Sequence, residues 1–266
     1  MPLLPKVARA DLHFWEEPCI SGKQGSGTIF FSGCSLSCVY CQNYDISHNG
    51  YGKIISYERL AEIFKELEQK GANNINLVNP THYVYAIKKA LDLYKPNIPV
   101  VYNSGGYDRV ETLKSLEGYI DVYLMDLKYL SAENAFKYSN AEDYPDVVQK
   151  ALLECYHQKN ICVFENELLK SGVIIRHLLL PQGTNEAIRV FDWYKKNIPN
   201  AYFSIMSQYS PCGAAVNISP INRSVTSREY NKVLDYICES NEERVYFQER
   251  ESKDKRYIPK FNLYGV

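Results

Sequence analysis

Short runs of apolar, β-branched and aromatic residues alternate along the chain with segments of helical periodicity. Residues 28–32 form the first run, which ends at a glycine as a buried strand does. Ser56 then precedes a segment in which apolar residues recur at positions i, i+3, i+4 and i+7 from Leu60, with Gly71 just beyond it. Serine caps the first turn of a helix, and glycine favours its end. The pattern therefore predicts a strand followed by an amphipathic helix.

The same alternation continues to about residue 238. Further strands are expected at residues 74–78, 99–102, 121–125, 173–180 and 202–206. Further helices are expected at residues 82–93, 109–116, 146–157, 185–196 and 228–238. Strands separated by helices predict right-handed crossovers and a parallel sheet, which is either an open doubly wound sheet or a whole or partial barrel. The pattern does not choose between these folds, but in both of them the ligand lies at the carboxyl ends of the strands.

Composition and charge exclude several classes of partner. The 266 residues include 30 Lys plus Arg and 31 Asp plus Glu, a net charge of -1, so no positive excess is available to hold nucleic acid or anionic lipid. No apolar run approaches the ~20 residues that span a bilayer, and the N-terminus lacks the apolar core of a signal peptide. We therefore expect a cytoplasmic protein that binds neither nucleic acid nor membrane. The 23 tyrosines can pack cores or line sites, and decide nothing alone.

The loop after the first predicted strand contains three cysteines within eight residues, Cys34, Cys38 and Cys41. In a reducing compartment, clustered thiols more often bind metal or do chemistry than form disulfides. Thiolates favour zinc or iron-sulfur clusters. A structural zinc site needs a fourth ligand, for which His48 or His82 is available, whereas a [4Fe-4S] cluster on three cysteines leaves one iron open for a substrate or cofactor. The position directly after a strand favours a catalytic loop.

The spacing Cys34-x3-Cys38-x2-Cys41, with Tyr40 before the last cysteine, resembles the signature of the radical S-adenosylmethionine (SAM) superfamily. The wider context, residues 27–43, is similar to the pyruvate formate-lyase activating enzymes, which activate glycyl radical enzymes. Three further segments, residues 101–107, 125–128 and 175–181, resemble motifs on later strands of that group. The resemblance implies an α/β fold, the partial (β/α)6 TIM-type barrel of the radical SAM core. It also implies a [4Fe-4S] cluster on the three cysteines, with SAM bound at the open iron.

The resemblance further implies an activity. One electron from the reduced cluster cleaves SAM into methionine and a 5′-deoxyadenosyl radical, which abstracts hydrogen, so we expect a radical SAM oxidoreductase. In the activating enzymes the hydrogen comes from a glycine of a partner glycyl radical enzyme, and a donor such as flavodoxin or ferredoxin supplies the electron. Radical modification of another peptide or of a small molecule is the alternative among enzymes. A non-catalytic zinc- or iron-sulfur-binding module is the alternative from another class.

No repeat or linker divides the chain, so we expect one radical SAM domain over residues 1–266. Within it, residues 1–26 are expected to form an N-terminal covering segment, residues 27–250 the barrel and residues 251–266 a C-terminal tail. The covering segment contains three residues whose role the sequence leaves open, Glu16, Glu17 and Cys19.

By the same resemblance, nine residues are expected to bind SAM: Tyr40, Asn79, Thr81, Asn103, Ser104, Asp126, Lys128, Arg176 and Gln208. Tyr40 is expected beside the adenine. Asp126 and Lys128 are two apart on a strand and thus point to the same side, although a structural ion pair explains them equally. Arg176 is expected to face the cofactor, and His177, on the opposite face, to be structural. No catalytic residue is assigned to the hydrogen-abstraction step.

Two positions depart from the family's pattern. Its second strand usually ends in a Gly-Gly-Glu motif that meets the SAM amino group, but Asn79-Pro80-Thr81 stands here. Asn79 or Thr81 is the candidate substitute for the carboxylate, and a simple turn before a helix is the alternative. After the last strand, where activating enzymes have a histidine, Gln208 is the candidate.

The remaining cysteines are expected to differ in role. Cys155, Cys162 and Cys238 have apolar neighbours at helical or strand spacing, which predicts core positions. Cys212 lies in a loop after the sixth strand, from which it can reach the barrel mouth.

Overall fold

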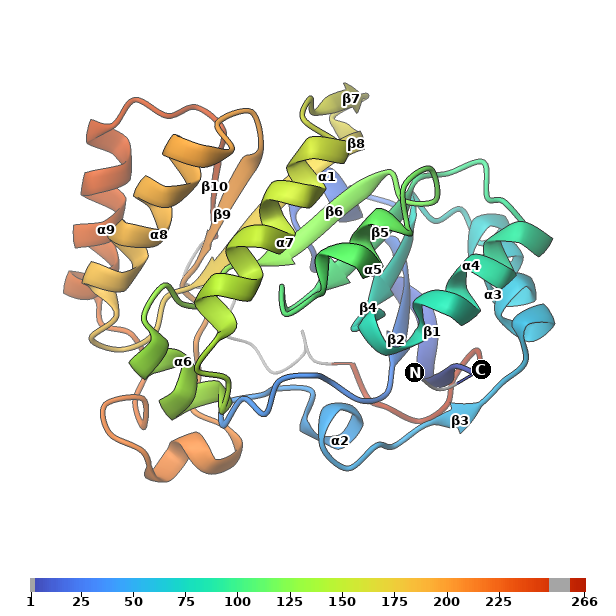
Figure 1. Ribbon diagram of the computed structural model, residues 1–266, viewed down its shortest axis with the longest axis horizontal. Coiled ribbons are helices and arrows are strands. Elements are labelled where there is room, and N and C mark those ends of the chain that lie inside the picture. Colours follow the sequence, from blue (N-terminus) through green and yellow to red (C-terminus); the bar gives the residue numbers. More distant parts are fainter. Residues whose placement is uncertain (1–2, 249–258) are drawn as a thin grey trace.

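A computed structural model describes residues 3–248 and 259–266, and its centre is a sheet with the strand order β10-β9-β8-β6-β5-β4-β2-β1-β3 (Figure 1). Six neighbouring strands are parallel: β2 (Ser26–Phe31), β4 (Ile75–Val78), β5 (Val100–Ser104), β6 (Val122–Asp126), β8 (Leu168–Leu178) and β9 (Tyr202–Met206). In the described part of the chain this order does not close on itself. The sheet is therefore a partial barrel.

Helices follow the parallel strands and cover the sheet: α3 (Tyr57–Gln69), α4 (Val84–Leu93), α5 (Val110–Lys114), α6 (Ala132–Ser139), α7 (Tyr144–Gln158), α8 (Thr184–Asn197) and α9 (Ser227–Glu239). Figure 1 shows α3 and α4 at one end of the molecule, α8 and α9 at the other, and α5 and α7 between them. This β-helix-β alternation confirms the expected α/β partial barrel.

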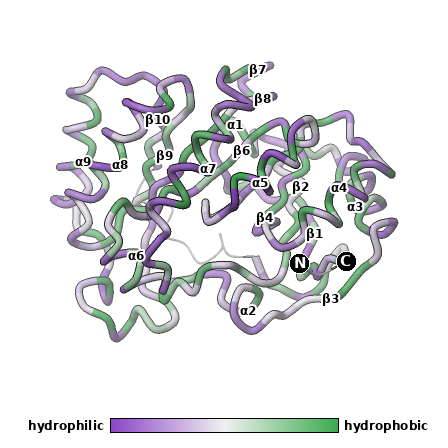
Figure 2. Tube along the Cα trace, in the orientation of Figure 1, coloured by the Kyte–Doolittle hydropathy of each residue, from purple (hydrophilic) through white to green (hydrophobic). Residues whose placement is uncertain are grey.

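Local sequence accounts for most of these elements. Every residue of β2, β4 and β5 is buried, as expected for strands of a parallel sheet that is covered on both faces. Ser56 caps α3 as predicted, since its side chain accepts a hydrogen bond from the amide of Arg59 at 3.2 Å. Along α8 and α9, hydrophilic and hydrophobic residues alternate (Figure 2), because one face of each helix packs into the hydrophobic core.

The N-terminal segment contributes elements that periodicity did not predict. β1 (Lys6–His13) pairs antiparallel with β2 and with β3 (Lys53–Ile54). The short helix α1 (Pro18–Ser21) buries Cys19 and Ile20 in a cluster with apolar residues of β5, β6 and β8. The segment thus supplies the strand between β2 and β3, and its short helix packs against β8.

Strands and short helices at the periphery complete the fold. β10 (Val245–Phe247) lies parallel to β9, and β7 (Val163–Glu165) pairs antiparallel with β8. α2 (Tyr44–Ser47), η1 (Thr81–Tyr83) and η2 (Gly213–Asn217) lie in the loops after β2, β4 and β9.

The C-terminal residues pack beside β1. The amide of Leu263 donates to the carbonyl of Ala8 at 3.0 Å, and the amide of Ala10 to the carbonyl of Tyr264 at 2.9 Å. The expected boundary between barrel and tail, residues 250–251, lies outside the described residues. None of the helices in the described ranges combines the length and apolarity that a bilayer crossing requires.

The cysteines outside the first loop correct one expectation. Cys155 is buried as predicted, and Cys162 is partly buried, but Cys238 is exposed. The buried face of α9 is formed by Val233 and Ile237, and the next residue along a helix points about 100° away from that face. The apolar neighbours of Cys238 were therefore a poor guide to its burial.

Candidate active site

The three-cysteine loop leaves β2 at Gly33, whose φ of +90° lies in the region that glycine favours. Two other loops hold it by backbone hydrogen bonds. The Val39 amide donates to the carbonyl of Tyr138 in α6 at 2.9 Å, and the Ala215 amide of η2 donates to the carbonyl of Val39 at 3.1 Å. The conformation of the loop is thus fixed by segments that follow β6 and β9.

Each thiol of the loop has one hydrogen-bond partner. Cys34 Sγ accepts from the Leu36 amide at 3.4 Å, Cys38 Sγ lies 3.0 Å from Ser139 Oγ, and Cys41 Sγ lies 3.2 Å from Ser47 Oγ. Burial raises the pKa of Cys34 to about 12 and also raises the pKa of Cys38. Metal ligation, which requires thiolates, therefore has to displace protons from buried thiols.

The donor set fits an iron-sulfur cluster. Three free thiols of one loop provide three soft ligands, which are the ligands of such clusters. Within the described ranges, no three His, Cys, Asp or Glu side chains are grouped to hold a metal ion. A [4Fe-4S] cluster binds each cysteine through a different iron atom, so its ligands do not have to converge on one ion. His48, an alternative zinc ligand, instead has Nδ1 2.8 Å from Ser47 Oγ.

A small cavity of about 10 Å3 joins the cysteine loop to the ends of β4 and β5. Its lining includes Cys34 together with Asn79, Thr81 and Ser104, three of the residues expected to bind SAM. Asn79 has a φ of +56°, and its amide donates to the carbonyl of Asn103 at 3.0 Å. The carboxyl ends of three neighbouring strands therefore meet at one hollow, as the parallel sheet requires.

Asp108 is a site residue that the sequence analysis missed. It is buried after β5, and its carboxylate accepts hydrogen bonds from Thr81 Oγ1 and from the Tyr102 hydroxyl, both at 2.8 Å, and from Ser104 Oγ. Burial raises its pKa above the ordinary range of an aspartate. Thr81 and Ser104, which both line the cavity, are thus held in their orientations by one carboxylate. An acid three residues after Gly105 was the only sequence signal.

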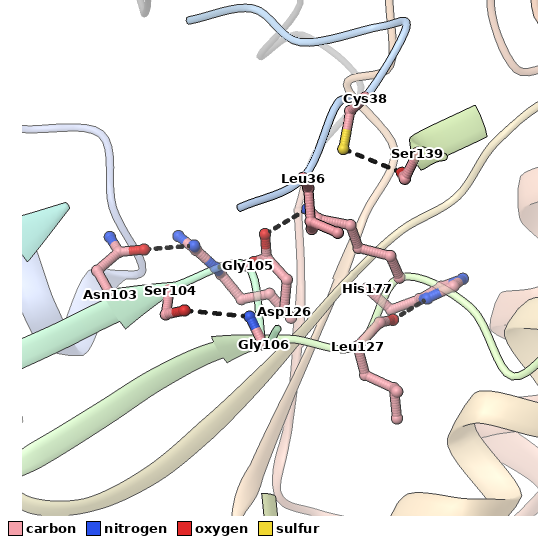
Figure 3. Close-up of polar contacts among 12 residues, drawn as sticks. Leu36, Cys38, Asn103, Ser104, Gly105, Gly106, Asp126, Leu127, Ser139 and His177 are labelled. Carbon is pink, nitrogen blue, oxygen red and sulfur yellow. Dashed lines mark hydrogen bonds and ion pairs between the residues drawn. The ribbon is translucent and has the colours of Figure 1, made fainter. Parts of the chain in front are cut away.

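Three charged residues form a row of ion pairs inside the barrel, here called the charged ladder: Arg176 of β8, Asp126 at the end of β6, and Lys128 in the loop after β6. Arg176 Nε donates to Asp126 at 2.9 Å, and a second guanidinium nitrogen donates to Asn103 Oδ1 at 2.6 Å. Asp126 also pairs with Lys128 Nζ at 2.6 Å. Burial acts to raise the pKa of Asp126, but Arg176 and Lys128 together hold it below its usual range. Figure 3 shows Asn103 and Asp126 projecting from neighbouring strands beside the cysteine loop.

Glu16, whose role the sequence left open, completes this ladder. One of its oxygens accepts from Arg176 at 3.1 Å, and the other accepts from the side chains of Asn76 and Asn103 at 3.2 and 3.3 Å. Glu17 is 2% exposed and lies in the field of Arg176, and burial raises its pKa. Two acids before a proline were the available signal, but the sequence could not indicate that they enter the barrel.

The other expected site residues lie apart from the cavity. The hydroxyl of Tyr40 is buried against that of Tyr129, and its ring lies 5.9 Å from the ring of Tyr209. Gln208 is half-buried, and its side-chain oxygen has no hydrogen-bond partner among the described residues. Cys212 Sγ donates to the carbonyl of Tyr40 at 3.1 Å, so this cysteine does reach the three-cysteine loop.

A larger cavity of about 230 Å3 lies between α6 and the loop that precedes α8. Lys128 and Tyr129 line it from the end of β6, and Asn134 and Lys137 line it from α6. His177 also faces this cavity and has Nδ1 2.7 Å from the carbonyl of Leu127. Burial lowers the pKa of His177, so its neutral form is favoured. Lys128 therefore lies between the rest of the charged ladder and this cavity.

Comparisons with known proteins agree with this arrangement. The family model of the radical SAM superfamily matches residues 28–206. The uncharacterized protein MJ0674 of Methanocaldococcus jannaschii is 34% identical over 245 residues, which cover 88% of this chain and 68% of that protein.

Two crystal structures of Streptococcus suis SuiB share the fold. The structure bound to S-adenosylmethionine has a TM-score of 0.59 and 14% identity, covering 84% of this chain and 50% of SuiB. The structure bound to the precursor peptide SuiA has a TM-score of 0.58 and 15% identity, covering 82% and 47%. This chain thus spans about half the length of SuiB.

The family match extends over β2 to β9 and includes the three-cysteine loop and the ends of the strands around it. The chain belongs to the radical SAM superfamily, whose members are enzymes that use a [4Fe-4S] cluster and SAM for radical chemistry.

Proposed function

We propose that Cys34, Cys38 and Cys41 hold the [4Fe-4S] cluster and that the enzyme abstracts hydrogen from a peptide or protein. The cavity that joins Cys34 to Asn79, Thr81 and Ser104 is the observation that carries this proposal. When bound, the cluster and SAM supply the one-electron cleavage that yields methionine and a 5′-deoxyadenosyl radical. The residues of the chain bind and orient these groups and exclude water.

The charged ladder suits the amino-acid end of SAM. Lys128 donates one of its ammonium hydrogens to Asp126, which leaves two for a ligand carboxylate. Arg176 is held by Asp126, Asn103 and Glu16, so it acts by keeping Asp126 and Asn103 in place. The cavity beside Cys34, about 10 Å3, is far below the ~300 Å3 of a small ligand pocket, so no more than one end of SAM enters it.

Two observations support a peptide substrate. SuiB, which shares the fold, has been solved with a precursor peptide. The cavity of about 230 Å3 beside Lys128 can take a side chain of such a substrate. The similarity of residues 27–43 to activating enzymes favours a second candidate, in which the hydrogen comes from a glycine of a glycyl radical enzyme. Flavodoxin or ferredoxin is the proposed electron donor, and residues 1–266 are proposed to form one domain.

The test is SAM cleavage by the anaerobically reconstituted and reduced protein, followed by quantification of 5′-deoxyadenosine. We expect product from the wild type and from Cys238→Ala, whose thiol is exposed on α9, and none from Cys41→Ala. Iron and sulfide analysis should give about four of each per wild-type chain. Binding of one zinc in place of the cluster would reject the proposal, as would absence of product from a fully loaded protein with bound SAM and a peptide library.

A further inference from the structure

Serine hydroxyls are the partners of two of the three thiols. Ser139, the last residue of α6, lies 3.0 Å from Cys38 Sγ, and both residues are buried. Ser47, the last residue of α2, lies 3.2 Å from Cys41 Sγ. Figure 3 shows Cys38 and Ser139 pointing toward each other from different segments of the chain. Both contacts join the proposed ligand loop to a side chain of a neighbouring helix.

Ligation would fix the direction of these hydrogen bonds. A free thiol and a hydroxyl can each donate, but a thiolate bound to iron carries no proton and can only accept. Ser139 would therefore donate to Cys38 and accept from the Tyr129 hydroxyl, which lies 3.1 Å from Ser139 Oγ. Tyr129 in turn would accept from Tyr40. The four groups then form one directed chain of hydrogen bonds that ends on the ligand sulfur.

The environment of Ser139 strengthens this arrangement. Ser139 is 1% exposed and Cys38 is 7% exposed, and a hydrogen bond in such a low-dielectric region is stronger than in water. The side chain of Ser139 is not needed to end α6, because Asn140 makes that cap with a φ of +51°. A buried hydroxyl without a capping role thus faces a proposed cluster ligand.

Ser47 likewise has a second hydrogen-bond partner, the exposed side chain of His48. His48 Nδ1 lies 2.8 Å from Ser47 Oγ and donates to it in the tautomer that carries the proton at Nδ1. The ring of His48 stacks on Tyr44 at 4.3 Å, which holds the imidazole in position. Ser47 can therefore donate to Cys41 while its own oxygen accepts a hydrogen bond.

We propose that Ser139 and Ser47 are positioning residues that raise the reduction potential of the cluster through hydrogen bonds to Cys38 and Cys41. Hydrogen bonds to ligand sulfurs stabilise the more negative, reduced form of an iron-sulfur cluster, and this is one of the ways in which proteins set its potential. Tyr40 and Tyr129 polarise Ser139, which gives two of the many tyrosines a function. The inference rests on the proposed assignment of the cysteines as ligands.

The test is a redox titration of the reconstituted, SAM-free protein, monitored by electron paramagnetic resonance of the reduced cluster. Ser139→Ala should lower the reduction equilibrium constant about tenfold, which is a midpoint shift of ~59 mV for one electron. Ser47→Ala and Tyr129→Phe should shift the midpoint in the same direction. Ser37→Ala removes an exposed hydroxyl from the same loop and should leave the midpoint unchanged.

The outcomes separate this inference from the assignment on which it rests. Wild-type midpoints in both Ser139→Ala and Ser47→Ala, with full iron and sulfide content, would overturn the inference and leave the ligand assignment intact. If Ser139→Ala does not take up the cluster, Tyr129→Phe decides, since it keeps Ser139 in place. A normal cluster in Cys38→Ala would instead refute the assignment of that ligand.

Discussion

Asp108 shows how a single buried carboxylate can organise several side chains of the site. It accepts hydrogen bonds from Thr81, Tyr102 and Ser104. Asp108→Ala leaves three hydroxyls without their acceptor, and an unsatisfied buried group costs about 1 to 3 kcal/mol. We expect the free energy of unfolding, measured with urea, to fall by about 3 kcal/mol. Tyr102→Phe removes one partner only and should cost about 1 kcal/mol, so equal losses in the two variants would contradict this account.

His177 should make stability depend on pH. Burial lowers its pKa below the ~6.5 of free imidazole, so the unfolded chain binds a proton more readily than the folded one. The stabilising effect of the neutral form is fully present above about pH 6.5 and is lost as pH falls from there towards the folded pKa. In urea denaturation, the free energy of unfolding should fall between about pH 7 and pH 5.5 in both proteins. The fall should be smaller in His177→Gln than in wild type by ~1 kcal/mol.

The matched control for this measurement is His157→Gln, because His157 is exposed at the end of α7. It should retain the wild-type pH dependence. If His177→Gln loses as much stability on acidification as wild type does, the buried imidazole is not the group responsible.

At the scale of elements, the close approach of β5 and β6 depends on a glycine. Gly106 has a φ of +83°, and an added Cβ would lie 2.4 Å from the carbonyl oxygen of Asp126 and 2.6 Å from Val148. Gly106→Ala therefore has to separate the two strand ends, which carry Ser104 and Asp126. We expect a loss of unfolding free energy of more than ~2 kcal/mol, from overpacking in addition to backbone strain.

Gly118→Ala isolates the effect of overlap from that of backbone strain. Gly118 has nearly the same φ, +82°, but apart from its chain neighbours no atom of the described residues lies within 4 Å of the added Cβ. This variant should cost only the ~1 kcal/mol of a left-handed non-glycine residue. Similar urea midpoints for the two variants would show that the strand ends can separate without cost.

The local periodicity of the sequence was sufficient to predict most of the helices and strands. It predicted α3 and its Ser56 cap, and it placed the six parallel strands to within a few residues, because burial on one face or on both faces leaves a short-range pattern. It missed β1, β3, β7 and β10, which lie at edges of the sheet or in a peripheral hairpin and have partly exposed sequences. Their pairing partners, rather than their own periodicity, make them strands.

At the scale of the whole molecule, an ion pair joins the N-terminal segment to a strand far away in the sequence. Glu16 pairs with Arg176, 160 residues away in sequence, and Arg176 holds Asp126. Glu16→Ala leaves a buried guanidinium with one of its two carboxylate partners. We expect a loss of about 3 kcal/mol in unfolding free energy, because removing one member of a buried pair exposes the other to an uncompensated desolvation cost.

A surface substitution provides the comparison. Glu133 is exposed in the first turn of α6, and Glu133→Ala should change the unfolding free energy by no more than ~0.5 kcal/mol. A loss from Glu16→Ala as small as that from Glu133→Ala would show that the ladder tolerates the missing charge.

The sequence by itself determined the alternation of strands and helices, the position of the cysteine loop at a carboxyl edge, and the radical SAM signature within it. These are short-range properties, since periodicity and motif spacing depend on neighbours along the chain. The ion pair of Asp126 and Lys128 was expected from a shared strand face, but β6 ends at Asp126, so the loop after it and not strand alternation places Lys128.

Only the tertiary structure decided which distant groups meet at the site. The contacts of Glu16 with Arg176 and of Ser139 with Cys38, and the enclosure of Asp108, each join segments that no local pattern relates. They arise because polar groups that the fold buries on one side of the partial barrel need hydrogen-bond partners, and those partners come from whichever segments the fold brings there.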